Sequence, residues 1–228
     1  MSQRPSGYPR RPDEDYATIA WPILALLAAR RTAPVGRIWD PCCGVGKLVA
    51  VLRIRGFDAI GTDTNFLATA VAPAGVSDLI TNPPYGENKR GELAVKFIEH
   101  ALALGVPCIA TLLRADFDSA KSRQHLFRRC EFFAGKVVLL DRIKWFDGPS
   151  SPSDNHAWFT WSCGHVGPPT ITYITRAEAN AHQTQKFTAA ETVEASYDRR
   201  ASARAGSLAI RWQRRSARSA LPGVRRPR

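Results

Sequence analysis

Apolar residues in the first 175 positions form short runs that end at turn residues, and these runs alternate with longer amphipathic stretches. Short runs of this kind favour buried strands, whereas apolar residues three and four apart favour helices. Strands are predicted at Arg37–Trp39, Asp58–Gly61, Asp78–Thr81, Val106–Leu113, Lys136–Asp141, Ala157–Trp161 and Ile171–Ile174. Helices are predicted at Ala20–Arg30, Gly46–Arg55, Glu92–Leu104 and Ser119–Arg129.

The order of these elements predicts an α/β protein. The early strands each lead into a helix, so we expect them to lie parallel in one sheet. Only a short Gly-Pro loop separates the last two strands, and this spacing favours an antiparallel hairpin. The expected architecture is a mostly parallel central sheet with an antiparallel hairpin at its C-terminal side.

The longest mostly apolar run, Tyr16–Ala29, is predicted to be a core helix. It has 14 residues and contains Pro22, whereas a membrane-spanning helix needs about 20 apolar residues. Three acidic residues precede it, which is unlike a secretory signal. We therefore expect no association with a membrane.

Charge favours acidic partners, with nucleic acid first among them. The chain has 32 Lys and Arg against 20 Asp and Glu, a net charge of +12 and a sequence pI near 10.0. Arginine supplies 25 of the 32 cations, a bias that genome base composition can also produce. The charge is therefore suggestive and does not by itself identify a partner.

Composition also divides the chain. Residues 176–228 hold 12 Lys and Arg against 4 Asp and Glu and contain few large apolar residues. Such a segment buries too little apolar surface to offset the entropy cost of ordering. We therefore expect a flexible N-terminal segment at 1–12, a folded domain at 13–175 and a largely disordered basic tail at 176–228. Within the tail, only Leu208, Ile210 and Trp212 alternate as on one face of a strand.

The five cysteines are an odd number and include no C-x-x-C pair, so neither a disulfide framework nor a zinc cluster is predicted. A reducing, cytoplasmic location fits this pattern. His156, Cys163 and His165 lie near one another in sequence, but nothing completes four ligands at a familiar spacing. We expect no metal site.

The first candidate for chemistry is the segment 38–46, a strand that ends in Asp40 and a Gly44-Val45-Gly46 turn before a helix. Such a turn lets a ligand approach bare backbone at the helix N-terminus. A dinucleotide site calls for a third small residue where Val49 stands, and a P-loop calls for Ser or Thr where Leu48 stands. The turn therefore favours binding of the methionine part of S-adenosylmethionine, and a purely structural turn is the alternative.

A second acid, Asp63, ends the next predicted strand. A carboxylate at that place can accept both hydroxyl groups of a ribose. The alternative is that Asp63 caps a turn, since Thr62, Thr64 and Asn65 surround it. Its position one strand after Asp40 favours the ligand-binding interpretation.

The most specific signal is Asn82-Pro83-Pro84-Tyr85, which directly follows a predicted strand. Two consecutive prolines fix the backbone, remove two donors and prevent an immediate helix. The Asn82 side chain is therefore expected to point outward at the carboxyl edge of the sheet, where ligand sites of α/β proteins form. A structural turn is the alternative.

This ordered set resembles the class I S-adenosylmethionine-dependent methyltransferases, specifically the amino-methylating branch typified by adenine-specific DNA methyltransferases. The resemblance implies a Rossmann-like methyltransferase fold, S-adenosyl-L-methionine as cofactor, and the exocyclic amine of adenine in DNA as target. It covers roughly residues 13–165, and the segment that contacts the cofactor's adenine corresponds here to Asn65-Phe66-Leu67. The implied cofactor-binding residues are Tyr16, Thr18, Asp40, Pro41, Cys42, Gly44, Gly46, Asp63, Thr64, Asn65 and Asn82.

The same resemblance implies a target pocket. Its catalytic residues would be Asn82, Pro83, Pro84 and Tyr85, with the Asn82 side-chain oxygen and the Pro83 carbonyl accepting from the amine. The implied substrate-binding residues are Tyr85, which would stack on the base, Lys89, Arg90, Trp158 and Phe159. Since adjacent strand residues face opposite sides, at most one of Trp158 and Phe159 can line the pocket, and core packing is their alternative role.

Three alternatives remain open at this point. The same turn occurs in relatives that methylate adenine in RNA or the side-chain amide of a glutamine in a protein. A third alternative is a non-catalytic nucleic-acid-binding relative. The basic tail could supply phosphate contacts in either nucleic-acid case.

Overall fold

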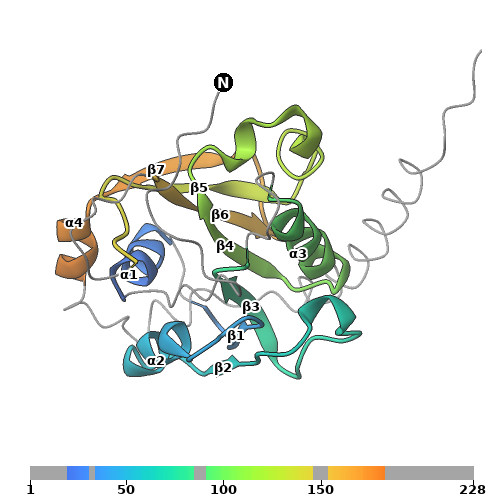
Figure 1. The fold of residues 1–228 in the computed structure, drawn as a ribbon, viewed down its shortest axis with the longest axis horizontal. Coiled ribbons are helices and arrows are strands. Elements are labelled where there is room, and N and C mark those ends of the chain that lie inside the picture. Colours follow the sequence, from blue (N-terminus) through green and yellow to red (C-terminus); the bar gives the residue numbers. More distant parts are fainter. Residues whose placement is uncertain (1–19, 31–33, 85–90, 146–153, 183–228) are drawn as a thin grey trace, which may run out of the picture.

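The computed structural model describes residues 20–30, 34–84, 91–145 and 154–182, and these form one α/β unit (Figure 1). All seven predicted strands are confirmed, with small shifts at their ends. The helices are α1 (Ala20–Ala29), α2 (Lys47–Ile54), α3 (Glu92–Ala103) and α4 (Arg176–Ala181), with short 3-10 helices η1 (Phe66–Ala68), η2 (Phe117–Ser119) and η3 (Lys121–Arg123). The strands are β1 (Arg37–Asp40), β2 (Ala59–Gly61), β3 (Val76–Thr81), β4 (Cys108–Arg114), β5 (Phe133–Leu139), β6 (His156–Ser162) and β7 (Thr170–Ile174).

The strands form a single mixed sheet in the order β2-β1-β3-β4-β6-β5-β7. The four strands from β2 to β4 are parallel, so their carboxyl ends meet at one edge. β6 is inserted antiparallel between β4 and β5. This arrangement confirms the predicted mostly parallel central sheet.

The predicted pairing of the last two strands is wrong. β6 and β7 run in opposite directions, but β5 lies between them, and β7 pairs in parallel with β5. Gly135 allows the backbones of β5 and β7 to approach closely, because a Cβ at Gly135 would lie 2.4 Å from the carbonyl oxygen of Thr170. A glycine inside a strand often marks such a contact between backbones.

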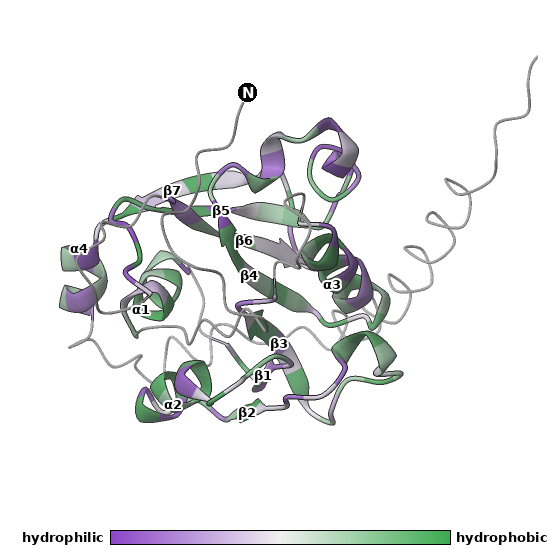
Figure 2. Cartoon of the chain, viewed as in Figure 1, coloured by the Kyte–Doolittle hydropathy of each residue, from purple (hydrophilic) through white to green (hydrophobic). Residues whose placement is uncertain are grey.

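Two apolar cores lie on the two faces of the sheet. One core joins the sheet to α1, α2 and α4, with Trp158 and Ile80 among its strand residues. The other joins it to α3 and to the residues that follow β4, with Phe159 and Leu79 among its strand residues. Figure 2 shows hydrophobic colour along β4 and hydrophilic colour on parts of α2, α3 and α4.

The predicted helix at Ser119–Arg129 is also wrong. This stretch forms part of η2, then η3, and then a series of turns. Its backbone amides bond mainly to carbonyls three residues back, as Leu126 does to Arg123 and Cys130 does to Phe127, so no α-helical series of hydrogen bonds forms.

The folded unit continues past residue 175, where we expected it to end. α4 begins with a capping box in which Thr175 and Glu178 exchange hydrogen bonds. Its Ala179 is fully buried in the core that contains α1. The rest of the predicted tail, residues 183–228, and the N-terminal segment lie outside the described residues.

Candidate active site

The chain leaves β1 at Asp40 and makes a glycine turn before α2 begins. Gly44 has φ 47° and Gly46 has φ 76°, so both residues adopt the left-handed conformation that favours glycine. A Cβ at Gly46 would meet nothing within 4 Å. The space beside this turn, at the N-terminus of α2, is therefore open to a ligand.

The end of β2 is joined to the same turn through the backbone. The amide of Cys43 donates to the carbonyl of Thr62 at 3.1 Å, and the amide of Thr62 donates to that of Asp40 at 3.0 Å. A backbone bridge also pairs Cys42 with Asp63. The two acids that the sequence analysis connected, Asp40 and Asp63, thus lie in adjoining turns at one edge of the sheet.

Asp63, Thr64 and Asn65 are exposed at this edge, directly before η1. Phe66 follows them and is 2% exposed, with its ring 5.5 Å from that of Trp39. The buried ring anchors the exposed segment to the sheet. The polar side chains before it are therefore available to a ligand that lies over the end of β2.

Gly61 is a requirement of this site that the sequence analysis missed. A Cβ at Gly61 would lie 2.6 Å from the Cβ of Cys43. Any larger residue would push the glycine turn away from β2. In the sequence, a glycine at the end of a predicted strand, directly before Thr62 and Asp63, could have indicated this close contact.

Asp40 is buried, with 3% of its surface exposed, and its Oδ1 accepts from the amide of Cys42 at 3.2 Å. Burial raises the pKa of its carboxyl group to about 7, and the nearby charge of Asp63 acts in the same direction. The Thr81 hydroxyl and the Cys42 amide oppose this shift. Asp40 therefore changes its charge near neutral pH, beside the glycine turn.

The Asn-Pro-Pro segment follows β3, the neighbour of β1. Trp39 pairs with Leu79 across these strands, so the segment starting at Asn82 extends beyond the end of β1 on the same edge. Asn82 is half-buried and Pro83 is buried. The structure thus brings the glycine turn and the Asn82 segment to neighbouring strand ends.

Several predicted site residues lie outside the described residues, and their placement remains a prediction. These are Tyr16, Thr18, Tyr85, Lys89 and Arg90.

Trp158 and Phe159, predicted as pocket walls, are both fully buried and lie in opposite cores. Trp158 Nε1 donates to the carbonyl of Pro22 at 2.7 Å. The Phe159 ring packs against those of Phe117 and Phe127. Core packing accounts for both side chains, which corrects their assignment as residues that contact a substrate.

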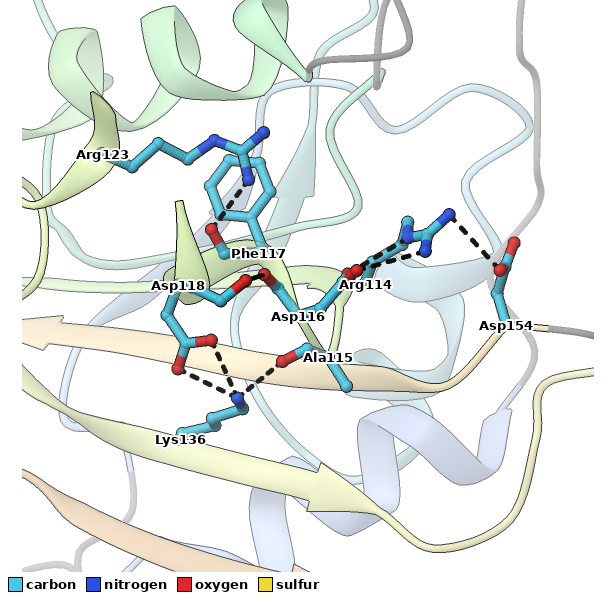
Figure 3. A network of polar contacts seen from close by, with 9 residues as sticks. Arg114, Ala115, Asp116, Phe117, Asp118, Arg123, Lys136 and Asp154 are labelled. Carbon is cyan, nitrogen blue, oxygen red and sulfur yellow. Dashed lines mark hydrogen bonds and ion pairs between the residues drawn. The ribbon is translucent and has the colours of Figure 1, made fainter. Parts of the chain in front are cut away.

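A network of charged residues at the carboxyl end of β4 was not anticipated (Figure 3). Arg114 forms ion pairs with Asp116 at 3.2 Å and Asp154 at 3.4 Å. Nearby, Lys136 of β5 donates to Asp118 and to the carbonyl of Ala115. In the sequence, the charged Arg114-Ala115-Asp116 directly after a predicted apolar strand could have indicated this network.

The residues at this edge fit S-adenosylmethionine. The glycine turn leaves room for a small polar ligand at the N-terminus of α2, whose amide groups favour a carboxylate. The exposed Asp63 carboxylate can accept from ribose hydroxyl groups. By contrast, no three His, Cys, Asp or Glu residues gather as metal ligands within the described ranges. None of the described helices is long and apolar enough to cross a membrane.

No family model matches the sequence, and no curated protein matches it. Among solved structures, the fold is similar to a protein from Listeria monocytogenes that is provisionally identified as a class I S-adenosylmethionine-dependent methyltransferase, at 12% identity and a TM-score of 0.46. That match covers 67% of this chain and 62% of the other, so the chain spans less than two thirds of that protein.

Two further solved structures show a similar level of likeness. One is the 23S rRNA methyltransferase ErmE, at 14% identity and a TM-score of 0.40, with 79% of this chain and 83% of the other covered. Another is the methyltransferase subunit of a type I restriction-modification system from Streptococcus thermophilus, at 11% identity and a TM-score of 0.40, covering 81% and 52%. Likenesses of this size concern the fold alone.

The protein has an α/β fold with a mostly parallel central sheet, as the sequence predicted. Its parallel strands end in a glycine turn, an exposed acid and an Asn-Pro-Pro segment along one edge.

Proposed function

We propose that this protein is an S-adenosylmethionine-dependent methyltransferase that transfers a methyl group to the exocyclic amine of adenine in DNA. The observation that carries the proposal is the arrangement of two neighbouring strand ends. β1 ends in Asp40 and the glycine turn, and β3, paired with β1, ends in Asn82 and Pro83. A cofactor held at the first strand end would therefore lie beside an amine held at the second.

The residues of the first strand end have distinct roles in this proposal. The backbone at Gly44 and Gly46 holds the methionine part of the cofactor, while Asp63 accepts from its ribose hydroxyls. Thr64 and Asn65 are exposed beside Asp63, and Asn65 begins the segment assigned to the cofactor's adenine. When bound, the cofactor supplies an electrophilic methyl group on a sulfonium.

At the second strand end, the Asn82 side-chain oxygen and the Pro83 carbonyl accept the two N–H groups of the amine. An aromatic amine is a weak nucleophile because its lone pair is delocalised into the ring. Two fixed acceptors favour the positive charge that develops on the nitrogen during attack. The remaining requirement is alignment, which a rigid proline-braced turn supplies.

A base that is paired within a duplex cannot present its amine to such a turn, so the target would be single-stranded or flipped out of the helix. The net charge of +12 favours a polyanionic substrate. Tyr85 is the proposed stacking partner of the base. Lys89 and Arg90, close to it in sequence, are proposed contacts to the substrate backbone.

The test is transfer of labelled methyl from S-adenosylmethionine to genomic DNA, total RNA and a protein extract in parallel. We expect label in DNA, lost in Asn82→Ala and retained in Asn180→Ala, an exposed asparagine on α4. Equal transfer by Asn82→Ala and the parent chain would falsify the assigned target pocket. Label found only in RNA or only in protein would support the methyltransferase reaction but show that the substrate is not DNA.

A second measurement separates the catalytic proposal from a non-catalytic relative. Calorimetry of the unmodified chain with S-adenosylmethionine should detect binding, which Gly46→Ala weakens. If the chain binds DNA but not the cofactor, it is a nucleic-acid-binding relative, and the methyltransferase proposal fails.

A further inference from the structure

Residues 119–130, which begin at the last residue of η2, form a strongly basic surface segment. The segment contains Lys121, Arg123, Arg128 and Arg129 and no Asp or Glu. Lys121, Arg128 and Arg129 are exposed, and the described structure gives none of them an ion-pair partner. These three cations are therefore available to an external anion.

The backbone of this basic segment is fixed by the core beneath it. Leu126 and Phe127 are buried, and Trp161 Nε1 holds the carbonyl of Leu126 at 2.8 Å. Arg123 lies over the Phe117 ring at 3.9 Å and donates to the Phe117 carbonyl. The exposed cations thus project from a preorganised backbone, which lowers the entropy cost of binding.

The acids that precede the segment are already paired. Asp116 is bound by Arg114, and Asp118 is bound by Lys136 (Figure 3). These pairs offset only part of the negative charge next to the segment, because Arg114 also pairs with Asp154. The segment itself holds four Lys and Arg and no Asp or Glu, so its own charge is positive.

The segment also lies next to the chain that follows the proposed target turn. Gly91, at the start of α3, is where the chain after Asn82–Pro84 re-enters the described structure. A Cβ at Gly91 would lie 3.0 Å from the Phe117 ring and 3.5 Å from Nη2 of Arg123. Arg123 and Phe117 thus lie beside Gly91, the first described residue after Pro84.

We propose that residues 119–130 are a docking surface for the phosphate backbone of a nucleic acid, with Lys121, Arg128 and Arg129 as the phosphate contacts. The inference rests on the proposed function in one respect: the docked strand is the one that delivers the target base. Cations of this kind position a strand without reading its sequence. The surface therefore supplies affinity near the pocket, while the pocket selects the base.

The experiment compares two double variants of the full chain, Arg128→Gln with Arg129→Gln and, as control, Lys144→Gln with Arg176→Gln. Each removes two exposed positive charges, and the control pair lies on the side of the sheet that carries α1. Binding to a short single-stranded DNA, the same sequence as RNA, the DNA duplex and a polyglutamate peptide is measured over a range of salt concentrations, without cofactor.

Loss of two phosphate contacts should reduce the slope of log affinity against log salt by about 1.4 to 1.8. At about 0.1 M salt the Arg128/Arg129 variant should bind on the order of tenfold more weakly, whereas the control stays within about twofold. Lys121→Gln, a milder change, should reduce the slope by about 0.7 to 0.9. The three nucleic acids show whether the surface prefers DNA, RNA or duplex.

The inference is overturned if both double variants lose equal affinity, if neither does, or if the parent chain binds polyglutamate as tightly as nucleic acid. These outcomes are separate from those of the proposed function. If nucleic-acid binding depends on Arg128 and Arg129 but no acceptor is methylated, the docking surface is supported and the catalytic proposal fails. Methyl transfer to DNA that is insensitive to this pair removes the docking surface alone.

Discussion

The ammonium group of Lys136 lies 2.9 Å from Oδ2 of Asp118 and thereby ties β5 to the residues that follow β4. The same group donates to the carbonyl oxygen of Ala115 at 2.6 Å. The contact is part-buried, with 15% of the Lys136 side chain and 30% of the Asp118 side chain exposed. It fixes the segment that leads from β4 into the basic surface.

Replacement of Lys136 with Met should therefore destabilise the fold. It leaves a carboxylate and a carbonyl without their donor, and we expect the free energy of unfolding to fall by about 1 to 2 kcal/mol. Denaturant unfolding measures this change. Lys144→Met, at an exposed lysine, should stay within about 0.5 kcal/mol. Equal effects of the two substitutions would mean that the Lys136 contacts contribute nothing.

Thr111 tests the opposite case, a buried hydroxyl without a partner. It is 1% exposed, and its Oγ1 makes no hydrogen bond within the described ranges. Thr111→Val keeps the shape and removes an unsatisfied polar group, so the free energy of unfolding should stay level or rise by about 1 kcal/mol.

Thr160, on the neighbouring strand, is the matched control, because its Oγ1 donates to the carbonyl of Gly135 at 3.1 Å. Thr160→Val should lower the free energy of unfolding by about 1 kcal/mol. Thermal or urea unfolding of both variants decides the matter. A clear destabilisation by Thr111→Val would show that its hydroxyl binds something, such as a buried water.

Two buried groups should oppose each other in the dependence of stability on pH. Asp40 has a pKa raised by burial from 3.8 to about 7, so between these values the folded state holds a proton that the unfolded state has lost. Its contribution to stability therefore falls as the pH rises through this window. Burial lowers the pKa of His156 from 6.5 to about 4, so there the unfolded state holds the extra proton. The contribution of His156 rises with pH over that window.

Single substitutions should separate the contributions of Asp40 and His156 to the pH dependence of stability. Between about pH 4 and pH 6.5, the stability of Asp40→Asn should rise with pH, because His156 then acts without opposition. The stability of His156→Gln should fall over the same range. Urea midpoints at several pH values measure both slopes. Parallel pH profiles for the two variants and the parent chain would contradict this account.

Local patterns in the sequence were sufficient for the strands but not for their pairing. Each strand is a short apolar run, so its position is a local property. The insertion of β5 between β6 and β7 depends on the close approach of Gly135 to Thr170, two residues far apart in the chain. In the predicted helix at 119–129 the amides bond mainly three residues back instead of four, and Trp161 of β6, distant in sequence, donates to the Leu126 carbonyl.

The candidate site shows the same division. Asp40, the glycine turn, Asp63 and Asn82 could be placed at one edge because each lies at or just after the end of a strand, and parallel strands bring their ends together. The pairing of Lys136 with Asp118 joins β5 to η2, and no local pattern in the sequence predicts it. Trp158 and Phe159 were misassigned because sequence alone does not distinguish a buried aromatic residue from a pocket wall.

Two glycines at opposite ends of α2 allow the effect of backbone strain to be separated from the effect of filling the proposed cofactor site. Gly46 has φ 76° and Gly56 has φ 85°, and a Cβ at either position would meet nothing within 4 Å. Gly46→Ala and Gly56→Ala should therefore each cost about 1 kcal/mol of stability through the strained backbone alone.

Their effects on the cofactor should differ. Only Gly46 belongs to the turn that would lie against the methionine part of S-adenosylmethionine, so only Gly46→Ala should fill space that the ligand needs. We expect calorimetry to show at least a tenfold loss of affinity for Gly46→Ala, about 1.4 kcal/mol, and little change for Gly56→Ala. If both variants bind the cofactor like the parent chain, the ligand does not lie over the glycine turn. If both lose affinity equally, the loss reflects strain in α2 rather than contact with the ligand.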